Sequence, residues 1–158
     1  MNESIPFPDV VRIETAGRCN FRCKHCYISN LRGLLDFKTF VSIFETLPAV
    51  PKTLVLYHGG EPMLNRELEK IVEYAMDSGV KKSVLNTNAS LIREIPGLTE
   101  MRVSFDGDTV EENNDIRIGS NFYKHAEKVL EIAKKQKVVI YNTRITGGEK
   151  PEPATYLT

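Results

Sequence analysis

Three cysteines, the only ones in the chain, lie within one short run as Cys19, Cys23 and Cys26. The C-x3-C-x2-C spacing allows three thiolates to bind a single inorganic centre. Thiolates are the usual ligands of iron–sulfur clusters, and a cubane of four irons held by three protein ligands leaves one iron open. The spacing therefore favours a 4Fe–4S cluster with an iron available for chemistry.

Other uses of the cysteines are weaker. A disulfide framework is disfavoured because an odd number of closely spaced thiols leaves one unpaired and joins no distant parts of a fold. Structural zinc is the main rival, with His25 as a fourth ligand, yet His25 directly precedes Cys26, and adjacent residues rarely reach the same tetrahedral ion. A non-catalytic iron–sulfur or zinc module remains an alternative.

The composition is that of one globular domain. The chain has 158 residues, of which 41% are apolar, with 21 basic and 21 acidic side chains. Zero net charge argues against a dedicated nucleic-acid binder. The chain shows neither a signal peptide nor an apolar run of about 18 residues, and unpaired thiols indicate a reducing compartment. We expect a cytoplasmic protein that binds no nucleic acid or membrane, with a domain at residues 1–146 and a flexible tail at 147–158.

Short β-branched runs alternate with helical patterns along the chain. Strands are predicted at residues 10–14, 53–57, 82–85, 102–105 and 138–141. Helices are predicted near residues 37–47, with Asp36 as the N-cap, at 66–78, with Asn65 as the N-cap, and at 121–136. The segment 90–95 is short and ends before Pro96. This order predicts an α/β fold with a parallel sheet of about five strands.

Polar and glycine-rich segments follow four of the predicted strands. Because the carboxyl ends of parallel strands meet at one edge of a sheet, these segments should converge on one mouth. In chain order they are the cysteine run, Gly59-Gly60-Glu61-Pro62, Thr87-Asn88 and Asp106-Gly107.

This ordered set resembles the radical S-adenosylmethionine superfamily over about residues 10–145, through the cysteine spacing, the Gly-Gly-Glu-Pro turn and the string Val-Ser-Phe-Asp-Gly at residues 103–107. Asn20 after the first cysteine and His25-Cys26-Tyr27 at the end are similar to the peptide- and protein-modifying maturases. The resemblance implies a partial (β/α) barrel, truncated after its fifth strand.

The resemblance also implies an activity. Cys19, Cys23 and Cys26 would hold the 4Fe–4S cluster, and S-adenosylmethionine would chelate the open iron. Reductive cleavage would give a 5'-deoxyadenosyl radical that abstracts hydrogen, here from a peptide or protein substrate. A flavodoxin- or ferredoxin-like protein would supply the electron. Activation of a partner by glycyl-radical formation is an alternative within the same class.

Particular residues match the family's cofactor positions. Gly59 and Gly60 lack side chains, so their backbone carbonyls could approach the methionine ammonium, while Glu61 adds a carboxylate. Arg117 matches an arginine that pairs with the methionine carboxylate, and the ring of His25 would lie toward adenine. Hydrogen-bonding side chains near the ribose are expected from Asn88, Ser104 and Asp106.

The chain departs from the family pattern at several points. Ala89 stands where related sequences often carry glycine, and the sixth strand–helix unit and the auxiliary-cluster cysteines are missing. A large substrate, a partner protein or an oligomer is therefore expected to close the open edge of the barrel. His58 is interpreted as a structural histidine, His125 as an exposed helix position and Arg144 as a surface residue.

Overall fold

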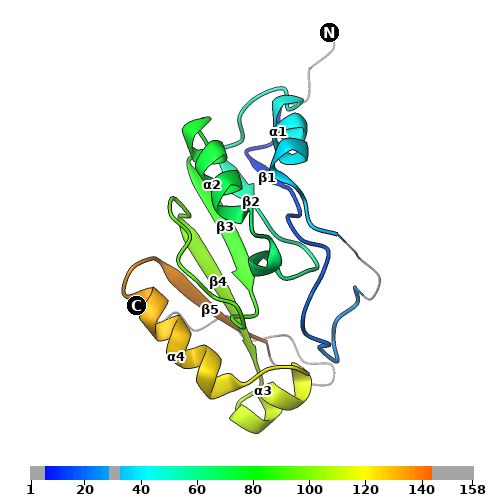
Figure 1. Ribbon diagram of the computed structural model, residues 1–158, viewed down its shortest axis with the longest axis vertical. Helices are drawn as coiled ribbons and strands as arrows, with labels where there is room; N and C mark the ends of the chain where they lie inside the picture. The colour runs from blue at the N-terminus through cyan, green and yellow to red at the C-terminus, as the bar shows by residue number, and fades with distance from the viewer. Residues whose placement is uncertain (1–5, 29–32, 144–158) are drawn as a thin grey trace.

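The computed structural model describes residues 6–28 and 33–143, which form a five-stranded parallel sheet with helices. The strands lie in sequence order and are β1 (Val10–Arg12), β2 (Thr53–Val55), β3 (Lys82–Thr87), β4 (Glu100–Asp106) and β5 (Val138–Thr143). Parallel strands in sequence order with crossovers of one hand place every connection on the same face. The sheet does not close, so the predicted α/β fold with a partial barrel is confirmed (Figure 1).

The helices cover one face of this sheet. They are α1 (Phe37–Glu45), the short 3-10 helix η1 (Pro62–Leu64), α2 (Leu68–Asp77), α3 (Val110–Ile116) and α4 (Phe122–Ala133). Phe40 of α1, Ile71 of α2 and Val129 of α4 belong to one buried core with Leu54 of β2 and Met101 of β4. Burial of these apolar side chains is the main source of the fold's stability.

Of the two predicted N-caps, Asp36 is observed and Asn65 is not. The Asp36 carboxylate accepts a hydrogen bond of 2.9 Å from the Thr39 amide, which confirms the predicted start of α1. The Asn65 side chain has another role, because its amide nitrogen donates to the carbonyl oxygens of Thr15 (2.9 Å) and Leu35 (2.8 Å). Helix α2 accordingly begins at Leu68, later than predicted.

The connections contain the largest departures from the predicted elements. Helix α3, capped by Thr109, and the short helix η1 were not predicted. The link between β3 and β4 has no helix, since Pro96 interrupts the backbone and Gly97 takes a positive φ of 78°. Ile95 of this link is nonetheless buried in the core, so an irregular segment covers the sheet where a helix would otherwise lie.

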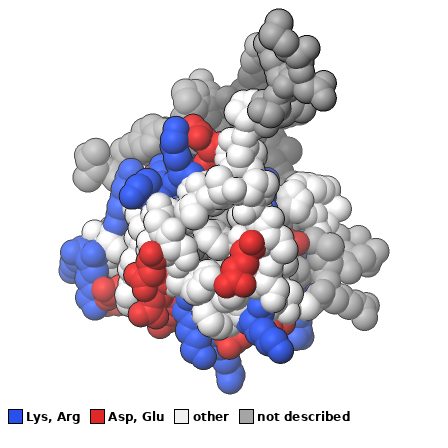
Figure 2. Space-filling model, turned by 90° about the horizontal axis from the view of Figure 1, so that it is seen from above, with Lys and Arg blue, Asp and Glu red and all other residues white. Residues whose placement is uncertain are grey.

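Charges are mixed over the surface. Figure 2 shows basic and acidic side chains interspersed on the upper face, without one sign gathered into a single large patch. Within residues 6–28 and 33–143, no helix has the length and apolar character needed to cross a membrane. The predicted tail at 147–158 and Arg144 lie outside the described residues.

Candidate functional site

The loop that carries the cysteines follows β1 and is held closely by the glycine turn after β2. The Glu61 amide donates a 2.7 Å hydrogen bond to the carbonyl oxygen of Arg18. A Cβ atom at Gly60 would lie 2.0 Å from the Ala16 carbonyl oxygen and 2.5 Å from that of Arg18, a separation no side chain tolerates. Only glycine therefore permits this approach of the two backbones. The predicted convergence of these two loops is observed.

On its other side the cysteine loop pairs with the connection between α3 and α4. The amides of Arg22 and Lys24 donate 2.9 Å hydrogen bonds to the carbonyl oxygens of Ile118 and Ile116. The Lys24 ammonium also lies 2.6 Å from the Asp115 carboxylate. In Figure 1 the cysteine loop, drawn in blue, runs from β1 down toward α3, although α3 comes much later in the chain. The loop is thus held between the second and fourth strand–helix units.

The three thiols of the cysteine loop differ in exposure. Cys19 and Cys23 are half-buried and Cys26 is exposed. Burial raises the pKa of Cys23; Arg117 opposes this shift, while Cys19 and Cys26 add to it. Within the described part of the chain, no three cysteine, histidine or carboxylate side chains are arranged to hold one metal ion. A cubane presents a different iron to each thiolate, so its ligands need not meet at one point.

The cysteine loop, the glycine turn and the ends of β3 and β4 form one edge of the sheet, here called the rim. Glu61 lies fully buried beneath it. Its Oε1 accepts hydrogen bonds from Thr87 Oγ1 (2.7 Å) and the Met63 amide (3.0 Å), and its Oε2 accepts one from the Asn88 amide (2.7 Å). Burial raises the pKa of Glu61, and these hydrogen bonds oppose the rise. The carboxylate therefore joins the glycine turn to the end of β3.

Asp106, at the end of β4, faces Arg117, at the end of α3. Arg117 Nε lies 2.6 Å from Asp106 Oδ2, with side chains 10% and 1% exposed. The contact lacks hydrogen-bond geometry, and among the described residues neither carboxylate oxygen nor Arg117 Nε has a hydrogen-bond partner. His25 Nε2 lies 3.7 Å from the same Oδ2. The site thus holds a buried ion pair with unused hydrogen-bonding capacity.

The predicted ribose-side residues lie at different depths. The side-chain Nδ2 of Asn88 donates to Asn20 Oδ1 (3.0 Å) and lies 3.7 Å from Cys19 Sγ, so Asn88 contacts the cysteine loop. Ser104 lies further down β4 and donates a 3.0 Å hydrogen bond to Asn86 Oδ1. Ala89 is buried with a positive φ of 65°, the conformation for which glycine is best suited.

Comparison with known proteins identifies the family. The model of the radical SAM superfamily matches residues 13–153. The chain belongs to the radical S-adenosylmethionine superfamily. This is a superfamily of enzymes whose cofactors are a 4Fe–4S cluster and S-adenosylmethionine, so the predicted family, enzyme class and cofactors are confirmed at the level of the family.

Two relatives and one solved structure illustrate the range of the superfamily. An AdoMet-dependent heme synthase of Oleidesulfovibrio alaskensis is 25% identical over 96% of this chain and 42% of its own length. An Fe-coproporphyrin III synthase of Methanosarcina barkeri is 31% identical over 62% of this chain and 27% of its own length. The chain therefore spans less than half of either relative.

Streptococcus suis SuiB, solved with its precursor peptide SuiA, has a TM-score of 0.63 and 18% identity. The match covers 85% of this chain and 32% of the SuiB chain. At this identity the similarity concerns the fold alone, and it agrees with the partial barrel described above.

Of the two histidines outside the cysteine loop, His125 differs from its predicted position. The prediction that His125 is exposed is wrong, since it is 5% exposed and its ring stacks on Phe21 at 5.8 Å. Burial lowers the pKa of His125, and Lys128 and Lys124 lower it further. Phe21 comes from the cysteine loop, so its contact with α4 could not be read from the periodicity of α4. His58 is exposed, with Nδ1 3.5 Å from Arg12 Nη1.

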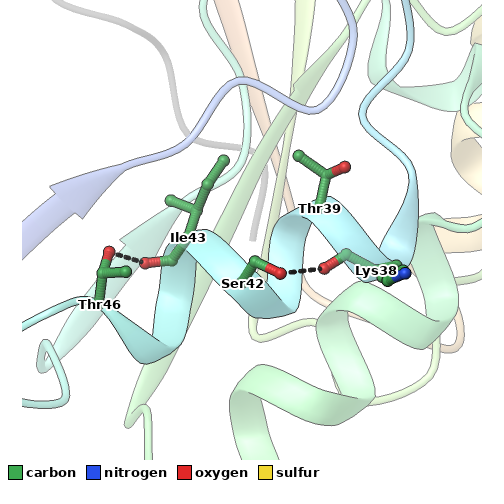
Figure 3. Close-up of a pocket in the computed structure, with 5 residues that line it drawn as sticks. All are labelled: Lys38, Thr39, Ser42, Ile43 and Thr46. Atoms are coloured by element: carbon green, nitrogen blue, oxygen red, sulfur yellow. Dashed lines mark hydrogen bonds between the residues drawn. The ribbon is translucent and has the colours of Figure 1, made fainter.

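A depression on the outer side of α1 is separate from the radical SAM motifs. Its lining consists of Lys38, Thr39, Ser42, Ile43 and Thr46 (Figure 3). Ser42 and Thr46 donate hydrogen bonds to the helix carbonyl oxygens of Lys38 and Ile43, at 3.1 Å and 2.7 Å. With its hydroxyls bound to the helix itself, this surface offers no group matched to the cluster or to S-adenosylmethionine.

Proposed function

We propose that this chain initiates radical chemistry. Cys19, Cys23 and Cys26 hold a 4Fe–4S cluster, and the neighbouring rim binds S-adenosylmethionine. When bound, the two cofactors supply reductive cleavage to a 5'-deoxyadenosyl radical that abstracts hydrogen. The observation that carries the proposal is the contact of Gly60 with the carbonyl oxygens of Ala16 and Arg18, because it presses the glycine turn against the cysteine loop. A metal-binding module would need only the cysteines.

The chemistry of the donors at the rim supports this proposal. Three thiols on one loop suit the cluster. The buried oxygens of Asp106 and Nε of Arg117 lack hydrogen-bond partners within the described residues, which is costly unless a ligand supplies them. We propose that Arg117 meets the methionine carboxylate, since its guanidinium has further donors beyond Nε. Asp106 then holds the guanidinium in place, besides accepting from the ribose.

The remaining rim residues are assigned by position. We propose that Gly59 and Gly60 present carbonyl oxygens to the methionine ammonium. Glu61 holds this turn to β3 through its hydrogen bonds with Thr87 and Asn88, and adds negative charge near the ammonium. Three further side chains are proposed to contact the nucleoside: His25 toward adenine, and Asn88 and Ser104 toward the ribose.

The substrate proposed is a peptide or protein, with a flavodoxin- or ferredoxin-like electron donor. The open edge of the five-stranded sheet supports a large substrate, because a five-strand sheet alone encloses no radical. A partner protein or a second copy could close the same edge. Two relatives carry the names of tetrapyrrole enzymes, which makes a tetrapyrrole the second candidate substrate.

The test is release of 5'-deoxyadenosine from S-adenosylmethionine by the anaerobically reconstituted protein with dithionite. Two variants are assayed alongside the wild type. One replaces Cys19, Cys23 and Cys26 by alanine, and the other, Lys38→Ala, changes the α1 depression. We expect release by the wild type and by Lys38→Ala, and none by the triple variant. A wild type that carries the cluster, as judged by absorbance, yet releases nothing with or without added peptide would favour the binding module.

A further inference from the structure

The sheet face opposite the helices carries two arginines, each stacked on a tyrosine. The Arg12 guanidinium carbon lies 5.5 Å from the centre of the Tyr57 ring, and that of Arg102 lies 5.3 Å from the centre of the Tyr141 ring. Arg102 Nη1 also donates a 3.3 Å hydrogen bond to the Tyr57 hydroxyl. These four residues, here called the arginine–tyrosine row, link β1, the segment just after β2, β4 and β5.

Strand alternation places this row on the inner face of the partial barrel. Met101 and Val103 of β4 are buried in the core shared with the helices. Successive side chains of a strand point to opposite faces, so Arg102 and Ser104 point away from the helices. The register sets Asn86 beside Arg102, and Tyr141 beside Ser104. Arg102 stands four residues before Asp106 on β4, about 13 Å below the rim at the usual rise per residue.

The row is rich in fixed hydrogen-bond donors. A guanidinium stacked on a ring loses little further freedom when it binds a ligand, and its planar fork matches a carboxylate. Arg102 Nε already bonds Glu100 Oε1 at 2.8 Å and Nη1 donates to the Tyr57 hydroxyl at 3.3 Å, which together hold the side chain. Arg102 is therefore held in place, and the exposed Arg12 has donors available to a ligand.

The charges around the row leave a positive surplus. Three cations, Lys82, Arg102 and Lys137, share the single carboxylate of Glu100. Among the described residues, Arg12 has no carboxylate within ion-pair distance, and its Nη1 lies 3.5 Å from His58 Nδ1. The Glu14 carboxylate, two residues further along the chain, accepts a 2.7 Å hydrogen bond from the Gly59 amide, so four cations stand against the two carboxylates of Glu14 and Glu100. The surplus predicts an anionic ligand.

We propose that the arginine–tyrosine row binds a substrate carboxylate, namely an aspartate or glutamate side chain of the peptide. This inference rests on the proposed function and specifies its substrate class. A peptide whose reacting residue lies at the rim reaches the row with an acidic residue about four positions away, since an extended chain advances about 3.3 Å per residue. The row therefore selects peptides by an acidic residue at a set distance from the site of hydrogen abstraction.

The test is a binding titration of the isotope-labelled protein followed by NMR, without S-adenosylmethionine. The probes are acetyl-Ala-Ala-Glu-Ala-Ala-amide, its glutamine counterpart and glutarate. We expect the acidic peptide to shift the Arg12, Arg102 and Tyr141 side-chain signals, and to bind about fivefold more tightly than the glutamine peptide, as a partly exposed ion pair allows. Added salt should weaken this preference.

Variants of the exposed Arg12 locate the effect. Arg12→Gln should bind the acidic peptide about fivefold more weakly than the wild type and the glutamine peptide equally well. Arg12→Lys should keep part of the preference for the acidic peptide. Lys38→Gln on α1 should leave both affinities unchanged. Equal binding of both peptides, or equal losses in Arg12→Gln and Lys38→Gln, would overturn the proposal. Tighter binding of glutarate than of the acidic peptide would overturn the peptide assignment.

This outcome is separable from that of the proposed function. The titration needs no cofactor cleavage, and Arg12 contacts none of the residues assigned to the cofactors. Arg12→Gln should therefore release 5'-deoxyadenosine at the wild-type rate when no substrate is present. Preference for the acidic peptide without any release of 5'-deoxyadenosine would support the binding role of the arginine–tyrosine row and refute radical initiation. Release without such a preference would support radical initiation and refute the binding role.

Discussion

The Cα of Gly60 packs so closely on the Ala16 carbonyl that a Cβ atom would lie 2.0 Å from the oxygen. The contact joins two loops that are separated by more than 40 positions in the chain. It sets the distance between the glycine turn and the first cysteine, and so the width of the proposed cofactor site.

Gly60→Ala should separate these loops. Relief of the clash requires backbone movement, and we expect a loss of about 3 kcal/mol in the free energy of unfolding, together with impaired cluster loading. Urea unfolding and the absorbance of the reconstituted protein measure the two effects. Gly79→Ala is the matched control, because Gly79 has a positive φ of 103° but open space around it. It should cost about 1 kcal/mol and leave cluster loading intact; similar effects of both changes would argue against the contact.

Glu61→Gln should destabilise the fold. The Asn88 amide donates to Oε2 and Thr87 donates to Oε1, whereas a glutamine offers only one acceptor oxygen and turns a donor toward one of these groups. We expect a loss of about 2 to 3 kcal/mol, measured by chemical unfolding. Thr87→Val removes one of these donors and also the acceptor of the Ala89 amide, but leaves the carboxylate and its other two donors in place, and should cost about 1 to 2 kcal/mol. A Glu61→Gln protein as stable as the wild type would refute this structural role.

Asp106→Asn should leave the buried charge of Arg117 without a counterion. Loss of one partner of a buried pair costs about 3 to 5 kcal/mol, and the double variant with Arg117→Gln should cost less than the sum of the single changes. A double-mutant cycle from urea unfolding measures the coupling. The exposed pair of Lys24 and Asp115 is the control, and Asp115→Asn should cost less than about 1 kcal/mol. Additive effects at Asp106 and Arg117 would contradict the pairing.

Stability should fall in acid through Glu100. Burial by itself raises the pKa of Glu100, but hydrogen bonds from Lys82, Arg102 and Lys137 outweigh it and lower the pKa to about 2. Because the folded-state pKa lies below the ordinary value of 4.5, the contribution is complete above that pH and is lost as the pH falls toward 2. Solvent exposure of the lysines limits it to about 1 to 2 kcal/mol.

Unfolding by urea between pH 6 and pH 3 measures this dependence. Glu100→Gln should be less stable than the wild type at pH 6, and the difference should shrink toward pH 3, because the Glu100 carboxyl of the unfolded chain gains its proton while that of the folded protein stays ionised. Salt should also reduce the difference, because the lysine partners are exposed. A difference that stays constant over this range would show that folding does not lower the pKa of Glu100.

Much of the fold was predictable because its signals are local. Five β-branched runs predicted the five strands, and the Asp36 side chain caps α1 as predicted. Helix α3 was missed because its seven residues are mostly polar, and its only fully buried residue is Asn113. Its position depends on hydrogen bonds such as that from the Asp106 amide to Asn113 Oδ1 at 3.0 Å, which no periodic pattern records.

The sequence by itself determined the cysteine spacing, the glycine turn and the alternation of strands and helices, since each depends on residues close together in the chain. Tertiary structure alone decided which distant groups meet. Arg117 faces Asp106 because β4 and α3 fold back on each other, and His125 is buried because Phe21 arrives from the cysteine loop. Likewise, Arg12 and Arg102 face one side only because the parallel register brings β1 and β4 into the same sheet. Packing of whole elements sets these contacts, and packing is a property of the assembled core.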